Sequence, residues 1–136
     1  MSPKSLLIPV LFAAVAATPL YAKPEIKDDP EIFSRLVTTA IAHEIRDKCS
    51  FIEARKLSAT FYVLGILRYA KSQGFSQEEI EAYRDIKTEQ DRLRAATYAY
   101  LDKNGVDRNK PESHCDLGEK EIASGSQVGK LIKSLK

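Results

Sequence analysis

The stretch from residue 57 to residue 70 reads LSATFYVLGILRYA, and its apolar side chains cover several sides of a helix. A helix that is apolar on so many sides is typically covered by neighbouring elements on more than one face. The stretch is shorter than a membrane span, which needs roughly 20 apolar residues, and Ser58, Thr60 and Gly65 interrupt it. We therefore expect a core helix with other helices packed around it.

The flanking residues suggest where this helix begins and ends. Ser50 and Glu53 have the spacing of a capping box, in which each side chain bonds the backbone of the other. Gly74 is a typical residue just past a helix end. The pattern predicts a helix from about residue 50 to Gln73.

Other segments carry helix signals of their own. Asp29-Pro30 is a typical N-cap followed by a first helical proline, which predicts a helix over residues 30–47. Ser76 and Glu79 form a second capping box, which starts a helix at Gln77. The helical pattern then continues to residue 103, before Asn104-Gly105, as one helix or as two.

The C-terminal part reads in the same way. Pro111 opens a helix that Gly125 ends, and Ser126 is placed to cap a last short helix. We find no period-two pattern that predicts a strand. The fold class is therefore all-α: a compact bundle of four to six helices over residues 30–136, after a flexible lead-in over residues 23–29.

Residues 1–22 have the pattern of a secretory signal. Lys4 is the only charge, an apolar run follows from Leu6 to Ala17, and Ala22 precedes Lys23, although Leu20 is larger than the usual residue three before a cut. We expect cleavage after Ala22, with a cut after Ala16 as the alternative. An uncleaved membrane anchor is the other interpretation, although the run is short for a span. The predicted location is the periplasm or the exterior of the cell.

The chain has two cysteines, Cys49 and Cys115, and both follow the signal. In an exported chain an even cysteine count favours a disulfide over free thiols. The bond would close a loop of roughly 67 residues, which the chain-entropy model equates with about 4 kcal/mol of stabilisation as an upper value. We expect this disulfide to hold the first helix to a late one.

Charge is nearly balanced, with 21 Lys and Arg against 19 Asp and Glu in the whole chain. A balanced chain has no long-range attraction to nucleic acid or to acidic membranes. We expect no nucleic-acid partner, and a membrane association only if the signal stays uncleaved.

Three motif-like stretches do not support a metal or cofactor site. His43-Glu44 lacks the second histidine of a metalloprotease helix, since Asp47 stands there. The turn at residues 102–107 has Asp107 at the sixth position, where a calcium loop needs glycine, and Ser113 at the twelfth, where it needs glutamate. The stretch at residues 124–131 lacks the hydroxyl residue after Lys130 that a phosphate loop needs. We expect no catalytic residue, no metal ligand and no cofactor.

Tyrosine and arginine are enriched at the energetic centres of protein interfaces. The candidate interaction surface consists of Tyr83, Arg84, Arg92, Arg94 and Tyr98. The simpler interpretation is that these tyrosines pack between helices with their hydroxyls at the rim.

Short segments along the chain resemble the domain-of-unknown-function family 5333, a family of small exported bacterial proteins. The segments are residues 42–46 (AHEIR), residues 74–83 (GFSQEEIEAY) and residues 115–131 (CDLGEKEIASGSQVGKL). The resemblance covers nearly all of the chain after the signal. It implies export and a helical domain with two cysteines, and it implies no activity.

Together these features predict an exported helical protein that is not an enzyme. We expect it to bind another protein, as an accessory subunit of a periplasmic or membrane complex. The alternative is a small-ligand-binding protein or an enzyme with a pocket between helices near His43, Glu44 and Asp47.

Overall fold

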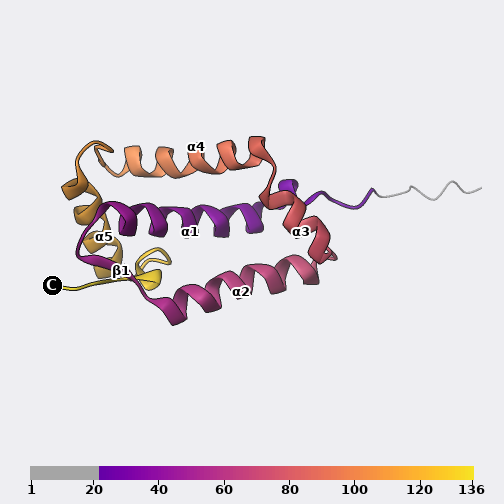
Figure 1. Cartoon of the computed structure of the whole chain (residues 1–136), viewed down its shortest axis with the longest axis horizontal. Coiled ribbons are helices and arrows are strands. Elements are labelled where there is room, and N and C mark those ends of the chain that lie inside the picture. The colour runs from indigo at the N-terminus through magenta and orange to yellow at the C-terminus, as the bar shows by residue number, and fades with distance from the viewer. Residues whose placement is uncertain (1–21) are drawn as a thin grey trace, which may run out of the picture.

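The structure is a computed structural model that describes residues 22–136. The central element of the fold is α1 (Pro30–Lys48). Figure 1 shows α1 between α2 (Lys56–Ser72) and α4 (Lys87–Lys103). The short helix α3 (Gln77–Arg84) joins α2 to α4 at one end, and α5 (Pro111–Ser124) packs at the other. The predicted all-α bundle is confirmed, with five α-helices in the described range. The predicted signal lies outside that range except for Ala22.

Two helices, α1 and α3, begin at a side-chain cap, and both caps are where the sequence predicted them. The Asp29 carboxylate accepts hydrogen bonds from the amides of Glu31 and Ile32, each at 2.9 Å. The capping box at Ser76 and Glu79 is complete, with both reciprocal bonds formed. These bonds use amide groups that have no partner inside a helix, so they define where α1 and α3 begin.

Residues 77–103 form two helices, which answers the question that the sequence left open. The backbone of Ile86 is extended, and the helix stops at Arg84 and resumes at Lys87. The side-chain amide of Gln90 donates a hydrogen bond to the Arg84 carbonyl at 3.0 Å. That bond gives the end of α3 a partner and stabilises the break.

The predicted helix start at Ser50 and Glu53 is wrong, because these residues flank and enter a strand. β1 (Ile52–Ala54) pairs antiparallel with β2 (Ile132–Ser134), and Ile52 lies opposite Ser134. Helix α2 begins only at Lys56. A strand of three residues is too short to show an alternating pattern, and its partner lies at the other end of the chain.

The last predicted helix is also wrong, although Ser126 does cap a turn. Its hydroxyl accepts a hydrogen bond from the amide of Gly129 at 3.0 Å. The turn is a single 3-10 helix, η2 (Gly129–Leu131), and β2 follows it directly. Pairing with β1 satisfies backbone groups that a helix would have satisfied internally.

The segment expected as a flexible lead-in makes contacts with the bundle. It contains the 3-10 turn η1 (Ile26–Asp28), and Ile26 packs against a small apolar cluster. The ammonium group of Lys23 lies 2.8 Å from a carboxylate oxygen of Glu79.

The predicted disulfide joins Cys49, at the end of α1, to Cys115 in α5. Both cysteines are buried in the larger of two apolar clusters. Gly118 permits close packing there, because a Cβ at that position would lie 2.2 Å from Cδ1 of Ile52. The bond thus joins α1 to α5 within the densest part of the core.

Helix α2 is not the covered core helix that its composition predicted. Only Ile66 and Ala70 of this helix are buried, and α1 takes the central place instead. Apolar periodicity shows which faces of a helix prefer cover, but it does not say which neighbour provides it. In the described chain one side of α2 has no neighbour.

Candidate functional site: an apolar groove beside an exposed helix face

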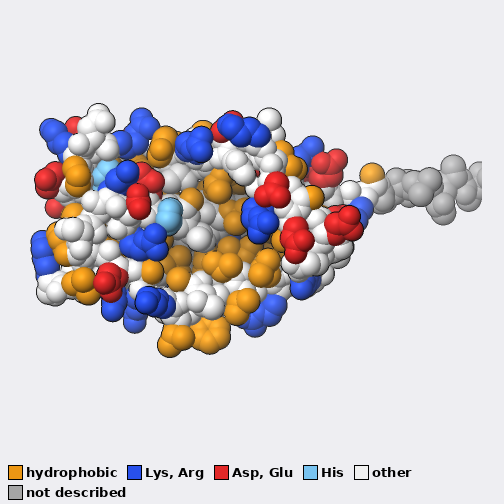
Figure 2. Space-filling view, in the orientation of Figure 1, with side chains coloured by type: hydrophobic (Ala, Val, Ile, Leu, Met, Phe, Trp, Pro, Cys, Tyr) orange, Lys and Arg blue, Asp and Glu red, His pale blue; other side chains and the backbone are white. Residues whose placement is uncertain are grey.

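A predominantly apolar hollow lies between α2 and the helices α1, α3 and α4. Its volume is about 460 Å³. Figure 2 shows it as a recess with hydrophobic side chains on its floor and charged side chains at its edge. We call this hollow the groove. Its apolar walls include Ile32 and Leu36 of α1, Ile66 and Leu67 of α2, Ile80 of α3 and Leu93 of α4.

The exposed apolar side chains of α2 adjoin the groove. Leu57 is 76% exposed, Phe61 62% and Leu64 43%. Because these residues are spaced by four and three positions, they lie on one face of the helix. We call them the stripe. Val63, 41% exposed, lines the groove. Leu67 lines it too, and it lies three positions from Leu64, so the groove and the stripe meet there on the helix surface. Figure 2 shows hydrophobic side chains continuing from the recess to the edge of the molecule that α2 forms.

Basic residues bracket the stripe at both ends. Arg55 and Lys56 precede it, Arg68 and Lys71 follow it, and residues 54–77 contain no acidic residue. Within residues 22–136, none of these four cations forms a salt bridge. Their charges are therefore available to a partner of the opposite sign.

The opposite wall of the groove has a different polar character. The Tyr83 hydroxyl donates a hydrogen bond to Glu89 at 3.3 Å, and Glu89 also pairs with Arg92 at 3.1 Å. Burial, followed by the nearby Glu89 carboxylate, raises the pKa of Tyr83. Glu81 and Arg84 also line the groove on this side.

The structure brings together only part of the candidate interaction surface: Glu89 links Tyr83 to Arg92. Tyr83 and Arg84 lie together at the wall of the groove. Arg92 stacks its guanidinium 3.9 Å from the centre of the Phe33 ring. Arg94 pairs with Asp91. Because Arg92 and Arg94 are two positions apart, their side chains leave α4 in directions about 200° apart.

Tyr98, the fifth of these residues, packs against the larger apolar cluster. The guanidinium of Arg108 lies 4.4 Å from the centre of its ring. This tyrosine therefore contributes to the packing of α4 on the core.

The alternative pocket near His43, Glu44 and Asp47 is not assembled from these three residues. A hollow of about 140 Å³ is lined by His43 but not by Glu44 or Asp47. The Nδ1 atom of His43 lies 3.1 Å from the Arg46 guanidinium, and Asp47 pairs with Lys48. Within the described residues, no group of three His, Cys, Asp or Glu side chains is placed to hold a metal ion.

The core contains two buried polar features that the sequence did not predict. The Glu121 carboxylate accepts hydrogen bonds from the hydroxyls of Tyr100 and Ser126, and this cluster links α4, α5 and the turn before η2. Burial, followed by the Glu121 hydrogen bond, raises the pKa of Tyr100 to about 12. No local spacing in the sequence brings these three residues together.

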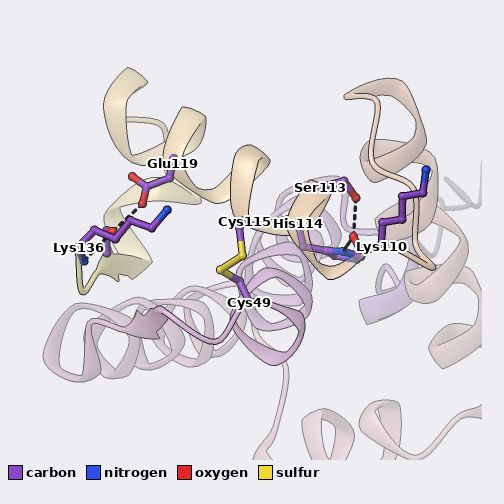
Figure 3. The surroundings of a disulfide bond; sticks show 8 residues. Cys49, Lys110, Ser113, His114, Cys115, Glu119 and Lys136 are labelled. Carbon is purple, nitrogen blue, oxygen red and sulfur yellow. Dashed lines mark hydrogen bonds between the residues drawn. A yellow bond between two sulfur atoms is a disulfide. The ribbon is translucent and has the colours of Figure 1, made fainter.

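The second feature is His114, which is fully buried beside the disulfide (Figure 3). Its Nδ1 atom lies 3.2 Å from the Lys110 carbonyl, and its Nε2 atom has no hydrogen-bond partner in the described chain. His114 is enclosed within the core, so it offers no accessible group for chemistry.

The groove and the stripe were also missed, because the sequence analysis assigned their side chains to the core. One sequence feature could have indicated that this helix has an exposed face: four cations and no acid lie around the apolar stretch. Among residues 22–136, no helix is long and apolar enough to cross a membrane.

The comparison with known families agrees with the resemblance seen in the sequence. Residues 24–133 match a family described as Family of unknown function (DUF5333). No curated protein and no solved structure matches the chain. The match includes every α-helix, both cysteines, the groove and the stripe. The chain belongs to the family of unknown function DUF5333.

Proposed function

We propose that the protein is an exported, non-enzymatic subunit that binds another protein through the groove and the stripe. The main support is the exposed apolar face of α2. Contiguous exposed apolar surface marks interaction sites on proteins that are otherwise polar outside. Covering a fully exposed Leu or Phe side chain stabilises a complex by about 1.5–3 kcal/mol, so Leu57 and Phe61 are suited to anchor a partner.

Export is supported by the signal pattern of residues 1–22 and by the disulfide. The periplasm is therefore the proposed location. Mass spectrometry of the protein recovered from periplasmic, membrane and cytoplasmic fractions tests it. A mature N-terminus at Lys23 in the periplasm is expected, and an intact Met1 in the membrane fraction would contradict cleavage.

Site-specific crosslinking tests the binding proposal. A photoreactive phenylalanine analogue replaces Phe61 on the stripe, and the matched control carries it at Ala123, an exposed position on α5. We expect one defined protein adduct at Phe61 and none at Ala123. The adduct protein, identified and purified, should lose binding to the Phe61→Ser variant. Equal adducts at both positions, or unchanged binding by Phe61→Ser, would reject the groove and stripe as the site.

A second candidate is a small apolar ligand, because the groove volume lies in the range of small-molecule sites. The stripe lies outside the hollow, so Phe61→Ser should leave such a ligand bound. An Ile66→Phe substitution, which fills the groove from α2, should displace it. Binding that is lost only in the Ile66→Phe variant favours a small ligand. Binding that is lost in both variants favours a protein.

A further inference from the structure

We propose that the groove and stripe bind an amphipathic helix of a partner protein whose apolar face is bracketed by acidic residues. This inference rests on the proposed function and adds the chemistry of the partner. Helix-in-groove binding places apolar side chains at positions i, i+3, i+4 and i+7 into a concave apolar surface. The groove offers that concavity, and the stripe adds exposed apolar surface on the adjoining face of α2.

The charges beside the stripe point to acids on the partner. Arg55 and Lys56 stand at one end, Arg68 and Lys71 at the other, with no carboxylate of residues 22–136 in salt-bridge distance. The two ends are about 20 Å apart along the helix. A partner helix of four to five turns with acids near both ends matches that spacing.

The start of α2 strengthens the same conclusion. No side chain caps it, and its first turn contains no acid. Cations near a helix N-terminus are unfavourable, because the macrodipole is positive there. A carboxylate from a partner would relieve both the bare amides and the repulsion between Arg55, Lys56 and the dipole.

A second copy of this chain does not provide the required charge. Pairing of α2 with another α2, parallel or antiparallel, brings cations against cations, since the helix carries no acid. Like charges placed together across an interface oppose association. This charge pattern opposes a dimer through α2, and the occupant that we propose is a different protein.

A lipid surface fits the groove less well than a helix does. An anionic bilayer would be attracted to the four cations, but it is flat where the groove is hollow. Glu81 and Glu89 line the far side of the groove, and Glu78 is exposed at the start of the same wall. These acids would repel anionic headgroups, whereas a helix can present its own cations to them.

Two synthetic peptides of about 16 residues test the inference on the purified protein by fluorescence anisotropy. Both have the same leucine face, and one has glutamates at its ends where the other has lysines. We expect the acidic peptide to bind about tenfold more tightly at low salt, as several exposed ion pairs predict. At about 0.5 M salt the difference should fall below twofold because screening shortens the range of these charges.

Charge variants provide the matched control. Arg68→Gln with Lys71→Gln should weaken the acidic peptide by about threefold to tenfold. Lys103→Gln with Lys120→Gln removes the same charge from exposed positions on α4 and α5. The two pairs are matched, because Lys71 and Lys103 are each the basic residue in the last turn of their helix. This second variant should bind normally.

Each outcome decides a separate point. Equal affinity for the two peptides, or equal effects of the two variants, overturns the acid-flanked helix but leaves the docking site. Binding to phosphatidylglycerol vesicles by a protein that binds neither peptide overturns it in favour of a membrane. A dimer in analytical ultracentrifugation that Phe61→Ser dissolves overturns it in favour of a second copy. Peptide binding unchanged by Phe61→Ser rejects the proposed site itself.

Discussion

Two regions of this small bundle, the α5 end and the α2 side, use apolar residues in opposite ways. Around α5 the apolar side chains, the disulfide and the β1–β2 pair enclose one another, and Ile45, Leu101 and Ile132 are fully buried. Along α2, residues of the same types face outward, and Leu57 is 76% exposed. We infer that the α5 end provides most of the stability, while the α2 side carries the surface that we propose for a partner.

Breaking the disulfide should have the largest effect on the α5 end. The double variant Cys49→Ala, Cys115→Ala is expected to lose about 4 kcal/mol of unfolding free energy, the upper value of the chain-entropy model for a loop of this length. Urea denaturation followed by circular dichroism measures the loss. Reduced wild-type protein is the control and should behave like the variant. A loss below about 1 kcal/mol would mean that packing alone holds this end.

A pair of identical substitutions compares the two regions directly. Leu101→Ala removes a side chain that is 0% exposed, and it should cost about 2–5 kcal/mol because a cavity remains. Leu57→Ala on the stripe should stay within about 0.5 kcal/mol of the wild type. Chemical denaturation of the two variants under the same conditions gives both values. Similar losses at the two positions would contradict the division between stability and binding.

High pH should weaken the α5 end through Tyr100, whose pKa is about 12 in the folded protein against an ordinary value of 10.0. Between these values the unfolded chain has lost the phenol proton while the folded chain retains it, so stability falls as pH rises. The stability is fully present below pH 10. Urea midpoints from pH 8 to pH 11.5 should show the decline.

The variant Tyr100→Phe isolates this effect, because it lacks the titrating phenol but keeps the ring. Its decline over the same pH range should be smaller than that of the wild type. Tyr83, whose pKa is also raised, stays in place and accounts for part of the remaining slope. An unchanged slope in Tyr100→Phe would exclude this cluster as the source.

The smallest expected effect concerns α3, which forms one wall of the groove. Ser76→Ala removes the capping bond to the amide of Glu79, and the loss should be about 1 kcal/mol. Amide hydrogen exchange of residues 77–84 should accelerate more than that of α5, because α3 is a local unit. Gln73→Ala, which alters an exposed polar residue near the end of α2, is the control. Uniform acceleration in all helices would show that α3 does not open separately.

Local chemistry explains what could be predicted from the sequence. Asp29-Pro30 and the box of Ser76 and Glu79 act on backbone amides within three residues, so their effect does not depend on the rest of the fold. The end of α5 at Gly125 is local in the same sense, since its φ of 63° favours glycine. The cysteine pairing followed from count and compartment.

The mistaken predictions all involve partners that are distant along the chain. Ser50 and Glu53 have the spacing of a capping box, yet pairing of Ile52–Ala54 with Ile132–Ser134 prevails. The Glu121 cluster likewise needs Tyr100 and Ser126 to come from separate elements. No short window of sequence contains both strands, or contains Tyr100 together with Glu121, so local pattern cannot reveal these contacts.

Helix α2 shows the limit most clearly. Its residues alone indicate a helix with apolar side chains on several faces, because side-chain direction follows from the period of the helix. Whether each face is covered depends on where α1, α3 and α4 pack, and this is a property of the assembled bundle. The amino-acid order thus accounts for the helices, the caps of α1 and α3, and the disulfide. The packed chain alone shows that the stripe is left open, because burial is a relation between elements and not within one.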